Sequence, residues 1–526
     1  MKPLRSACLT FLAITALASL TAGATAPANR PTDAAIDRVV ARTMSAFSVP
    51  GIAVGIIKDG KLVFSKGYGV RALDKPDKVD IDTLFAIGSN TKAFTTAALS
   101  MLVDEGKIHW DDKVIDYLPD FRMFDPFVTR EFTIRDLLTH RSGLGLGAGD
   151  LLFVTPTDFT RHDVLRALRY LKPVTSFRSE FAYDNLMYVV AGEVIAAASG
   201  QSWEDFVEAR ILKPLHMDAC ATESARLKST ADVAAPHVLV EGKLTRIAPL
   251  EVPIVGPAGG IQCNITGMAK WVVTQLAHGK APDGATLWSG DQSQEMWSAQ
   301  TILPARGKVA ALTQTHLASY GLGWGLQDYM GYLSVSHDGG LPGMVTHVGL
   351  LPELNVGVLV LTNQQDGYAL GAIALQILDA YVGAPQRDWV DITIAANAAR
   401  KEQMKESNAA RKPSTVAGPA PANLDAYVGT FTDAWRGDAT ITRHGDGLEL
   451  SISHTKALTG PLTWVGNGIF VARWLDRTLD ADAYVRFTPD YDGRIGGFTM
   501  QAESASTDFS YDFQDLDFKR AAAPIH

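Results

Sequence analysis

The run Phe85-Ala86-Ile87-Gly88-Ser89-Asn90-Thr91-Lys92 leads directly into an apolar stretch, Ala93 to Val103, that is typical of a buried helix. Residues three apart lie one turn from each other on a helix, so Ser89 and Lys92 are expected side by side at its N-terminus. A serine hydroxyl becomes a good nucleophile only next to a base, and a lysine amine within reach is such a base. The run therefore predicts an activated serine at the start of a helix.

The non-catalytic alternative is a surface serine and lysine in the first turn of a helix. The chain itself shows that the spacing is not sufficient, because Ser453 and Lys456 repeat it. That second pair follows alternating apolar and polar residues from Leu448 to Ile452, and on a strand residues three apart point to opposite faces. The second pair is interpreted as a chance match.

Two further motifs contain residue types used in catalysis. Tyr183-Asp184-Asn185 precedes an amphipathic run, Leu186 to Ala198, so Asp184 or Asn185 is alternatively a helix N-cap and Tyr183 a packed aromatic residue. Ser336-His337-Asp338-Gly339-Gly340 follows a strand-like stretch and is alternatively a glycine-rich hairpin turn. What chance does not explain is the ordered set of Ser-x-x-Lys, Tyr-x-Asn and His-x-Gly.

This ordered set resembles the serine β-lactamase and penicillin-binding-protein superfamily, in particular its class C-like branch of D,D-carboxypeptidases, D-aminopeptidases and esterases. The resemblance covers residues 33–383. Four further phrases are similar to segments of that family: Leu137 to Leu144, Gly256 to Ile261, Tyr320 to Trp324 and Gly357 to Asn363.

The resemblance implies a role for each matching residue. Ser89 would be the acylated nucleophile, and Lys92 would hold or relay its proton. Tyr183 would act as general base, as a phenolate stabilised by the Lys92 ammonium, which requires a lowered tyrosine pKa. Asn185 would orient Lys92 and bind the substrate amide. Which of Lys92 and Tyr183 takes the serine proton stays open.

The third motif would complete the site. The backbone N–H groups of Ser89 and Gly340 would form the oxyanion hole, and Gly339 would let the strand approach the substrate. His337 stands where better-known members of the superfamily have a lysine that binds a substrate carboxylate. Because a histidine is mostly neutral above pH 7, His337 disfavours a β-lactamase or D,D-carboxypeptidase and favours the esterase and aminopeptidase branches.

The N-terminus predicts a signal peptide, residues 1–24, with basic Lys2 and Arg5, an apolar core from Leu9 to Leu20 and a small-residue cleavage site. The mature protein is therefore expected to be exported, periplasmic or secreted, with no stable membrane insertion. Loss of Lys2 and Arg5 and of no acidic residue changes the net charge from −9 to −11, which argues against nucleic-acid binding.

Metal and cofactor motifs have little support in this sequence. The 12 histidines show no HExxH spacing, and no dinucleotide or P-loop motif is present, so neither a metal nor a cofactor is expected. Cys220 and Cys263 remain in the mature chain, and two unpaired thiols are the default expectation, with a disulfide as the alternative that export permits.

The predicted architecture is an α+β (α/β sandwich) domain at 33–383, a linker at 384–423 and a small all-β barrel at 424–520. A helix at 33–47 and a hairpin around Asp59-Gly60 begin the first domain, and a helix from Gly371 to Tyr381 ends it. The resemblance implies an antiparallel sheet flanked by helices, a mostly helical lobe and a cleft lined by the segments 143–158 and 290–318.

The C-terminal region shows short strands between Gly445-Asp446-Gly447, Gly466-Asn467-Gly468 and Asp492-Gly493 turns. Its opening, Leu424 to Phe431, resembles the lipocalin-like β-domain of some of these hydrolases. Covering the cleft, forming a homo-oligomer or adding stability are its possible roles.

The leading function is an exported serine hydrolase that forms an acyl-enzyme through Ser89 and cleaves amide or ester bonds of small peptides, including those with D-residues, or of esters. The alternatives are a β-lactamase or D,D-carboxypeptidase, a slow-acylating sensor of peptidoglycan or β-lactams, and a structural role carried by the barrel.

Overall fold

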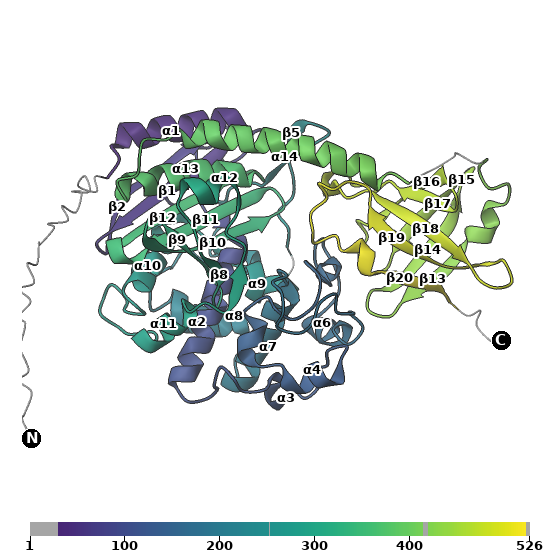
Figure 1. Ribbon diagram of the computed structural model, residues 1–526, viewed down its shortest axis with the longest axis horizontal. Helices are drawn as coiled ribbons and strands as arrows, with labels where there is room; N and C mark the ends of the chain where they lie inside the picture. Colours follow the sequence, from purple (N-terminus) through teal and green to yellow (C-terminus); the bar gives the residue numbers. More distant parts are fainter. Residues whose placement is uncertain (1–29, 252, 414–418, 522–526) are drawn as a thin grey trace, which may run out of the picture.

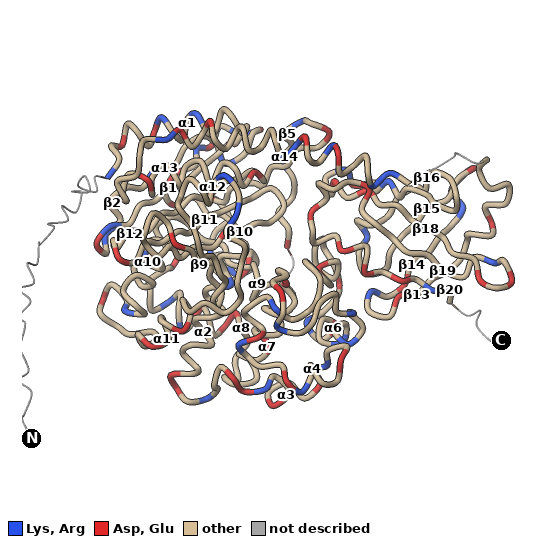
Figure 2. Tube along the Cα trace, viewed as in Figure 1, with Lys and Arg blue, Asp and Glu red and all other residues tan. Residues whose placement is uncertain are grey.

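The computed structural model describes residues 30–251, 253–413 and 419–521. The predicted signal peptide, residues 1–24, lies outside these ranges. Two bodies are visible in Figure 1, a large one that contains an open sheet and a smaller barrel, with the long helix α14 (Trp389–Arg411) running from the first toward the second. Lys and Arg residues are interspersed with Asp and Glu residues over both bodies (Figure 2).

The large body is built on an eight-stranded antiparallel sheet in the order β2-β1-β12-β11-β10-β9-β8-β7. The predicted sheet is confirmed, including the fact that it combines both ends of the domain. Its strands are β1 (Gly51–Lys58), β2 (Lys61–Gly69), β7 (Thr301–Leu303), β8 (Ala318–Tyr320), β9 (Gly325–Tyr329), β10 (Tyr332–Leu341), β11 (Met344–Leu351) and β12 (Val356–Thr362).

Helices cover both faces of this sheet. On one face, α1 (Asp33–Phe47) and α13 (Gly367–Tyr381) bury their apolar residues against β1 and β12. On the other face lies α10 (Ile265–Leu276), whose Ile265 and Val272 reach the backbone of Gly55 and Gly357. Strands β1 and β12 are buried on both sides, which explains their nearly unbroken apolar sequence.

The helical lobe lies between β2 and β9 in sequence. Its longer helices are α2 (Thr91–Asp104) and α7 (Asn185–Ser199), and both are largely buried. The shorter ones are α3 (Val114–Tyr117), α4 (Pro126–Glu131), α5 (Ile134–Leu137), α6 (Arg161–Ala167), α8 (Trp203–Val207), α9 (Gly256–Gly259) and α11 (Gly290–Met296). A further short helix, α12 (Gly307–Leu312), joins β7 to β8 and lies beside the sheet (Figure 1).

Two small two-stranded sheets complete this body. One pairs β3 (Phe85–Ala86) with β6 (Gln262–Cys263), and the other pairs β4 (His237–Val240) with β5 (Lys243–Arg246).

Cys220 and Cys263 form a disulfide, so the expectation of two unpaired thiols is wrong. The tertiary structure brings the two cysteines together. Ala221 pairs with Gln262 through two backbone hydrogen bonds of 3.0 and 2.9 Å, which sets Cys220 directly opposite Cys263. Gly267 leaves room for both sulfur atoms.

The C-terminal body is a closed eight-stranded antiparallel barrel, which confirms the predicted all-β barrel. The three predicted turns fall between consecutive strands. The strands are β13 (Gly429–Asp433), β14 (Gly437–His444), β15 (Gly447–Ile452), β16 (Thr459–Gly466), β17 (Ile469–Ala472), β18 (Ala483–Pro489), β19 (Ile495–Ala502) and β20 (Asp517–Arg520).

Much of the predicted linker is helical. The helix α14 packs on α13 and α1, and Trp389 at its start is buried, with Nε1 donating to the Asp379 carboxylate at 2.6 Å. Over the described ranges, no helix combines the length and apolar character needed to cross a membrane.

Candidate active site

Ser89 lies at the tight turn that joins β3 to α2. The turn is held from one side by the Ile87 N–H, which donates to the Ile261 carbonyl at 2.9 Å. Gly88 takes a left-handed φ of 52°, which glycine adopts at little cost. The chain then turns through a short 3-10 segment, Gly88–Asn90, into α2, and this leaves the Ser89 side chain partly exposed.

Lys92 is completely buried, one helical turn after Ser89. Three oxygen atoms of the described residues surround its Nζ atom: Ser89 Oγ at 2.9 Å, Asn185 Oδ1 at 2.7 Å and the Ala258 carbonyl at 3.0 Å. Burial lowers the pKa of Lys92 to about 7, and the nearby Asp150 and Asp184 carboxyl groups oppose that change.

Neutral Lys92 has two N–H bonds and one lone pair. The amide oxygen of Asn185 and the carbonyl oxygen of Ala258 can only accept hydrogen bonds, so both N–H bonds are directed to them. The lone pair is then left for the Ser89 hydroxyl. In its neutral form Lys92 is therefore placed to accept the serine proton.

Tyr183 also lies near Ser89, and interaction with the serine hydroxyl acts to lower the pKa of Tyr183. Lys92 Nζ lies 4.7 Å from the centre of the Tyr183 ring. The prediction of a lowered tyrosine pKa is nevertheless wrong here, because burial raises the pKa of Tyr183 well above its usual value. In this structure Tyr183 is a protonated phenol and Lys92 is the more readily neutralised group.

Asn185, the first residue of α7, has its amide fixed from both sides. Its Oδ1 atom accepts from Lys92, and its Nδ2 atom donates to Asp150 Oδ2 at 2.8 Å. Asp150 belongs to the segment 143–158, which was expected to line the cleft, although the residue itself was not singled out. Tyr320, two residues after the other expected segment, 290–318, hydrogen-bonds His337.

Asp184 is the N-cap of α7, so the structural alternative for this residue is correct as well. Its carboxylate accepts from the Leu186 N–H at 3.0 Å and from Ser142 Oγ at 3.1 Å. Burial raises the pKa of Asp184 to about 7. The Asp184 N–H donates to Nδ1 of buried His140, whose ring centre lies 4.1 Å from that of Tyr183.

Strand β10 runs past the Ser89 turn at very short range. A Cβ atom on Gly339 would overlap the Ile87 carbonyl oxygen and the Thr346 hydroxyl, so the glycine makes room for the turn. The predicted role of Gly339, close approach to the substrate, stays a prediction. A Cβ atom on Gly340 would meet open space, whereas one on Gly88 would lie 2.7 Å from the Gly340 nitrogen.

Asn90 joins the two segments and was not identified from the sequence. With its amide oriented to suit its neighbours, Nδ2 donates to the His337 carbonyl at 2.8 Å, and Oδ1 accepts from the Gly339 N–H at 3.3 Å and the Thr346 hydroxyl at 2.8 Å. The signal available in the sequence was a polar residue directly after the serine.

His337 is buried and neutral. Its Nδ1 atom donates to the Asp338 carbonyl at 2.6 Å, because a carbonyl can only accept. The Nε2 atom of the neutral ring then accepts from the Tyr320 hydroxyl at 2.9 Å. Burial, with the Lys92 charge, lowers the pKa of His337 to about 4.

The structure thus brings Ser89, Lys92, Tyr183 and Asn185 together and sets His337, Gly339 and Gly340 on the strand beside them. Within the described ranges, no group of three or more His, Cys, Asp or Glu side chains is arranged to hold a metal ion.

The solved structures with similar folds include the octameric penicillin-binding protein homologue from Pyrococcus abyssi. That match has a TM-score of 0.61 at 23% identity and covers 89% of this chain and 98% of that one. SurE matches with a TM-score of 0.53 at 19% identity, over 93% of this chain and 99% of that one.

Sequence relatives agree with the fold. Unguisins hydrolase ungD' of Aspergillus campestris is 31% identical over 422 residues, 76% of each chain, and Protein flp of Staphylococcus aureus is 26% identical over 334 residues, 63% of each. A profile described as a domain of unknown function (DUF3471) matches residues 413–520. The beta-lactamase family profile matches residues 36–381, so the chain belongs to that family and is a serine hydrolase of the β-lactamase superfamily.

Proposed function

We propose that this protein hydrolyses amide or ester bonds of small peptides or esters, including peptides with D-residues, through an acyl-enzyme on Ser89. The observation that carries the proposal is the environment of Lys92. Two oxygen acceptors, on Asn185 and Ala258, direct the lone pair of the neutral amine toward the Ser89 hydroxyl, 2.9 Å away.

In acylation, Ser89 Oγ attacks the substrate carbonyl carbon while its proton passes to Lys92 Nζ. The oxyanion of the tetrahedral intermediate is stabilised by the N–H groups of Ser89 and Gly340, each worth about 2.7–4 kcal/mol. The bond to the leaving group then breaks, and the Tyr183 hydroxyl delivers a proton to the departing nitrogen or oxygen and regains one from Lys92. Water repeats these steps on the acyl-enzyme and releases the acid, and Ser89 recovers its proton.

Two features bear on the substrate. His337 is neutral at physiological pH and hydrogen-bonded to Tyr320, so it supplies no fixed positive charge for a carboxylate. This disfavours D,D-carboxypeptidase and β-lactamase activity. One relative is named a hydrolase, of unguisins, and a SurE structure was determined with D-Leu, which supports including D-residues among the substrates of this proposal.

A cavity of about 540 Å³ includes Leu341, the residue after Gly340, in its lining, and in this proposal it would receive one side of the substrate. Its lining is mostly apolar, which favours an apolar substituent on that side. The apolar lining residues include Leu227, Val233, Ile247, Leu250, Leu341 and Met344.

The proposal includes export to the periplasm or the outside of the cell. The Cys220–Cys263 disulfide supports this, because such bonds persist in oxidising compartments. A fusion of residues 1–40 to a reporter enzyme that is active only in an oxidising compartment tests this part of the proposal, and an expressed but inactive reporter would contradict export.

The proposal also includes self-association through the barrel. Its surface exposes Leu475 and Tyr491, and one solved neighbour is octameric. Light scattering of the purified mature protein should give a mass above that of one chain, and a monomer at all concentrations would remove this part of the proposal.

A substrate panel tests the hydrolase proposal. Purified protein and its Ser89→Ala variant are compared on a short-chain nitrophenyl ester, a D-alanyl nitroanilide and a chromogenic cephalosporin. Turnover that depends on Ser89 supports the proposal and identifies the substrate branch. Turnover that persists in Ser89→Ala, or a folded protein that leaves every probe intact, argues against it, and the second result favours a slow-acylating sensor.

A further inference from the structure

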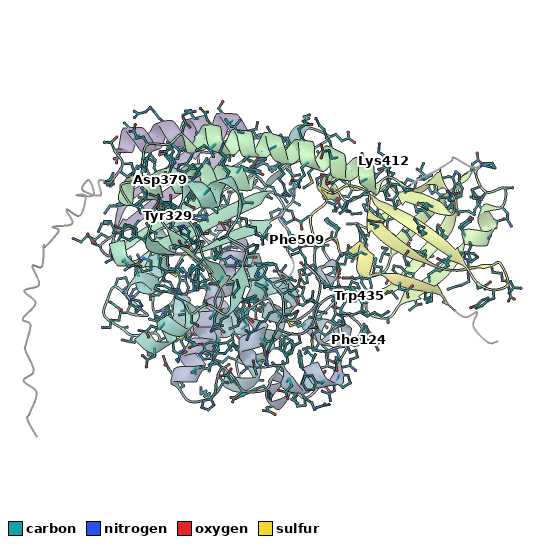
Figure 3. The ribbon with its side chains drawn as sticks, in the orientation of Figure 1. Phe124, Tyr329, Asp379, Lys412, Trp435 and Phe509 are labelled. Atoms are coloured by element: carbon teal, nitrogen blue, oxygen red, sulfur yellow. A yellow bond between two sulfur atoms is a disulfide. The ribbon has the colours of Figure 1, made fainter. Side chains whose placement is uncertain are left out.

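The loop Glu503–Asp512, which leaves β19 of the barrel and returns to β20, crosses to the hydrolase domain. Figure 3 shows its Phe509 between the two bodies. The ring of Phe509 lies edge-on to that of Tyr183, 6.1 Å between centres, and its backbone carbonyl lies against Gly147. The barrel therefore reaches the site itself and not only the surface around it.

Ser510, the next residue, makes a specific polar contact. Its Oγ atom donates to Asp150 Oδ2 at 2.9 Å, and the same oxygen accepts from Asn185 Nδ2 at 2.8 Å. Asn185 Oδ1 in turn accepts from Lys92 Nζ at 2.7 Å. A continuous set of hydrogen bonds thus joins the barrel loop to the amine beside Ser89.

Asp512 holds the backbone around Asp150. Its carboxylate accepts from the Gly149 N–H at 2.6 Å and from the Leu151 N–H at 3.0 Å, on either side of Asp150. Both carboxyl groups are completely buried. The position of Asp150 is therefore set by the barrel loop at two points, through its side chain and through its main chain.

The position of Asp150 matters because an asparagine amide can face either way. If Nδ2 of Asn185 were turned to Lys92, one donor would face another, and the lone pair of the neutral amine would be directed to the amide in place of Ser89. An acceptor on the far side of Asn185 prevents this turn. Asp150 is that acceptor, and Ser510 fixes the orientation of its carboxyl group.

The loop is anchored independently on its own side. The Ala505 N–H donates to Asn408 Oδ1 of α14 at 2.6 Å, and Glu503 pairs with Arg473 of the barrel. These anchors give the loop a defined path before it reaches Asp150.

We propose that the barrel completes the active site of the hydrolase, with Ser510 as a positioning residue that acts through Asp150 and Asn185 to keep Lys92 directed at Ser89. This inference rests on the proposed function of Ser89 and Lys92. It assigns the C-terminal domain a part in the chemical step, in addition to any part in substrate access.

Kinetics of Ser510→Ala in the full-length mature protein test the proposal. Loss of one hydrogen bond in this set should lower kcat about tenfold and change KM less than about twofold, because the proposal has Ser510 act through Asp150 and Asn185. Ser506→Ala is the matched control, since its hydroxyl pairs with Ser504 inside the same loop. It should keep the parent kcat.

A second pair of variants isolates the hydroxyl from side-chain volume. Ser510→Thr keeps the hydroxyl and should retain kcat within about threefold, whereas Ser510→Val has the same shape without it and should behave like Ser510→Ala. Equal losses in Ser510→Thr and Ser510→Val would indicate packing alone and overturn the proposal, as would a parent-like kcat in Ser510→Ala.

A crystallographic comparison separates this inference from the proposed function. In Ser510→Ala the Asn185 amide should turn or Lys92 Nζ should move away from Ser89 Oγ. Unchanged positions of both would overturn the inference. If the parent enzyme shows no turnover that depends on Ser89, the proposed function fails, while this comparison still decides whether Ser510 positions Lys92.

Discussion

The Nζ atom of Lys92 lies 2.9 Å from the hydroxyl oxygen of Ser89 and is directed to it by acceptors on either side. The amine can receive the serine proton only when it is neutral. Its pKa, lowered by burial to about 7, places this requirement within the physiological range.

We therefore expect kcat/KM to rise with pH through a midpoint near 7. The sign follows from the base: below its pKa Lys92 is an ammonium and has no lone pair, and above it the amine accepts the proton. Measurement of kcat/KM from pH 5 to 9 with an uncharged ester substrate checks this. A flat profile over that range would mean that Lys92 is not the proton acceptor.

Two variants assign the midpoint to Lys92. Several titratable groups face its amine: Asp150, Asp184, His140, Tyr183, Tyr188 and His337. Asp184 raises the pKa of Lys92 through its negative charge, so Asp184→Asn, which keeps the helix cap, should move the midpoint to lower pH. Lys92→Arg should be inactive at every pH, because the guanidinium stays charged.

Tyr183→Phe should slow acylation by about two orders of magnitude or more, which is typical of losing a positioned acid–base group. The phenylalanine ring keeps the packing against His140 and Phe509, so the fold should be unchanged. Because burial keeps Tyr183 protonated, the variant should leave the midpoint near pH 7 in place. The burst rate with an activated ester measures this, and a rate near that of the parent would exclude a role for the hydroxyl.

Features that depend on local sequence were predictable. The first helix, the Asp59-Gly60 hairpin and the barrel turns follow from capping, periodicity and turn residues a few positions apart. The pairing of Ser89 with Lys92 is also a local feature, because a separation of three residues at the start of a helix determines it. The local sequence predicts these features correctly because tertiary packing favours the same local structure.

Features that depend on distant segments were not predictable. The Ala258 carbonyl at Lys92 carries no side-chain signal, and Ser510 lies 360 residues from Asp150. The disulfide depends on the pairing of Ala221 with Gln262. The expected phenolate is contradicted for a related reason: the resemblance places Lys92 beside Tyr183 but does not reveal the burial that outweighs the charge of the lysine.

Removal of the disulfide by Cys220→Ser with Cys263→Ser should lower the free energy of unfolding by about 2–4 kcal/mol, since the bond closes a chain segment with a sequence separation of 43 residues. Urea unfolding of the parent with and without reductant checks the value, and the double variant should show no response to reductant. A parent insensitive to reductant would mean that the thiols are not bonded.

His337→Gln should change kcat/KM less than about threefold, and equally for substrates ending in a carboxylate or a carboxamide. The reason is that neutral His337 offers a hydrogen bond and not a charge, and glutamine retains an acceptor for the Tyr320 hydroxyl. Paired substrates that differ only in this terminal group make the comparison. A selective loss for the carboxylate would show that His337 binds it as a cation.

Gly339→Ala should be far more damaging than Gly340→Ala, although the two glycines are adjacent on β10. An added methyl group at 339 would overlap the Ile87 carbonyl and the Thr346 hydroxyl, whereas at 340 it would enter open space. Overpacking of this kind destabilises by about 1–3 kcal/mol. At 339 it would also push the strand away from the Ser89 turn, so that loss of activity accompanies the lower melting temperature. Thermal unfolding and turnover of the two variants, measured together, check this, because equal behaviour would mean that the spacing between β10 and the turn does not control the site.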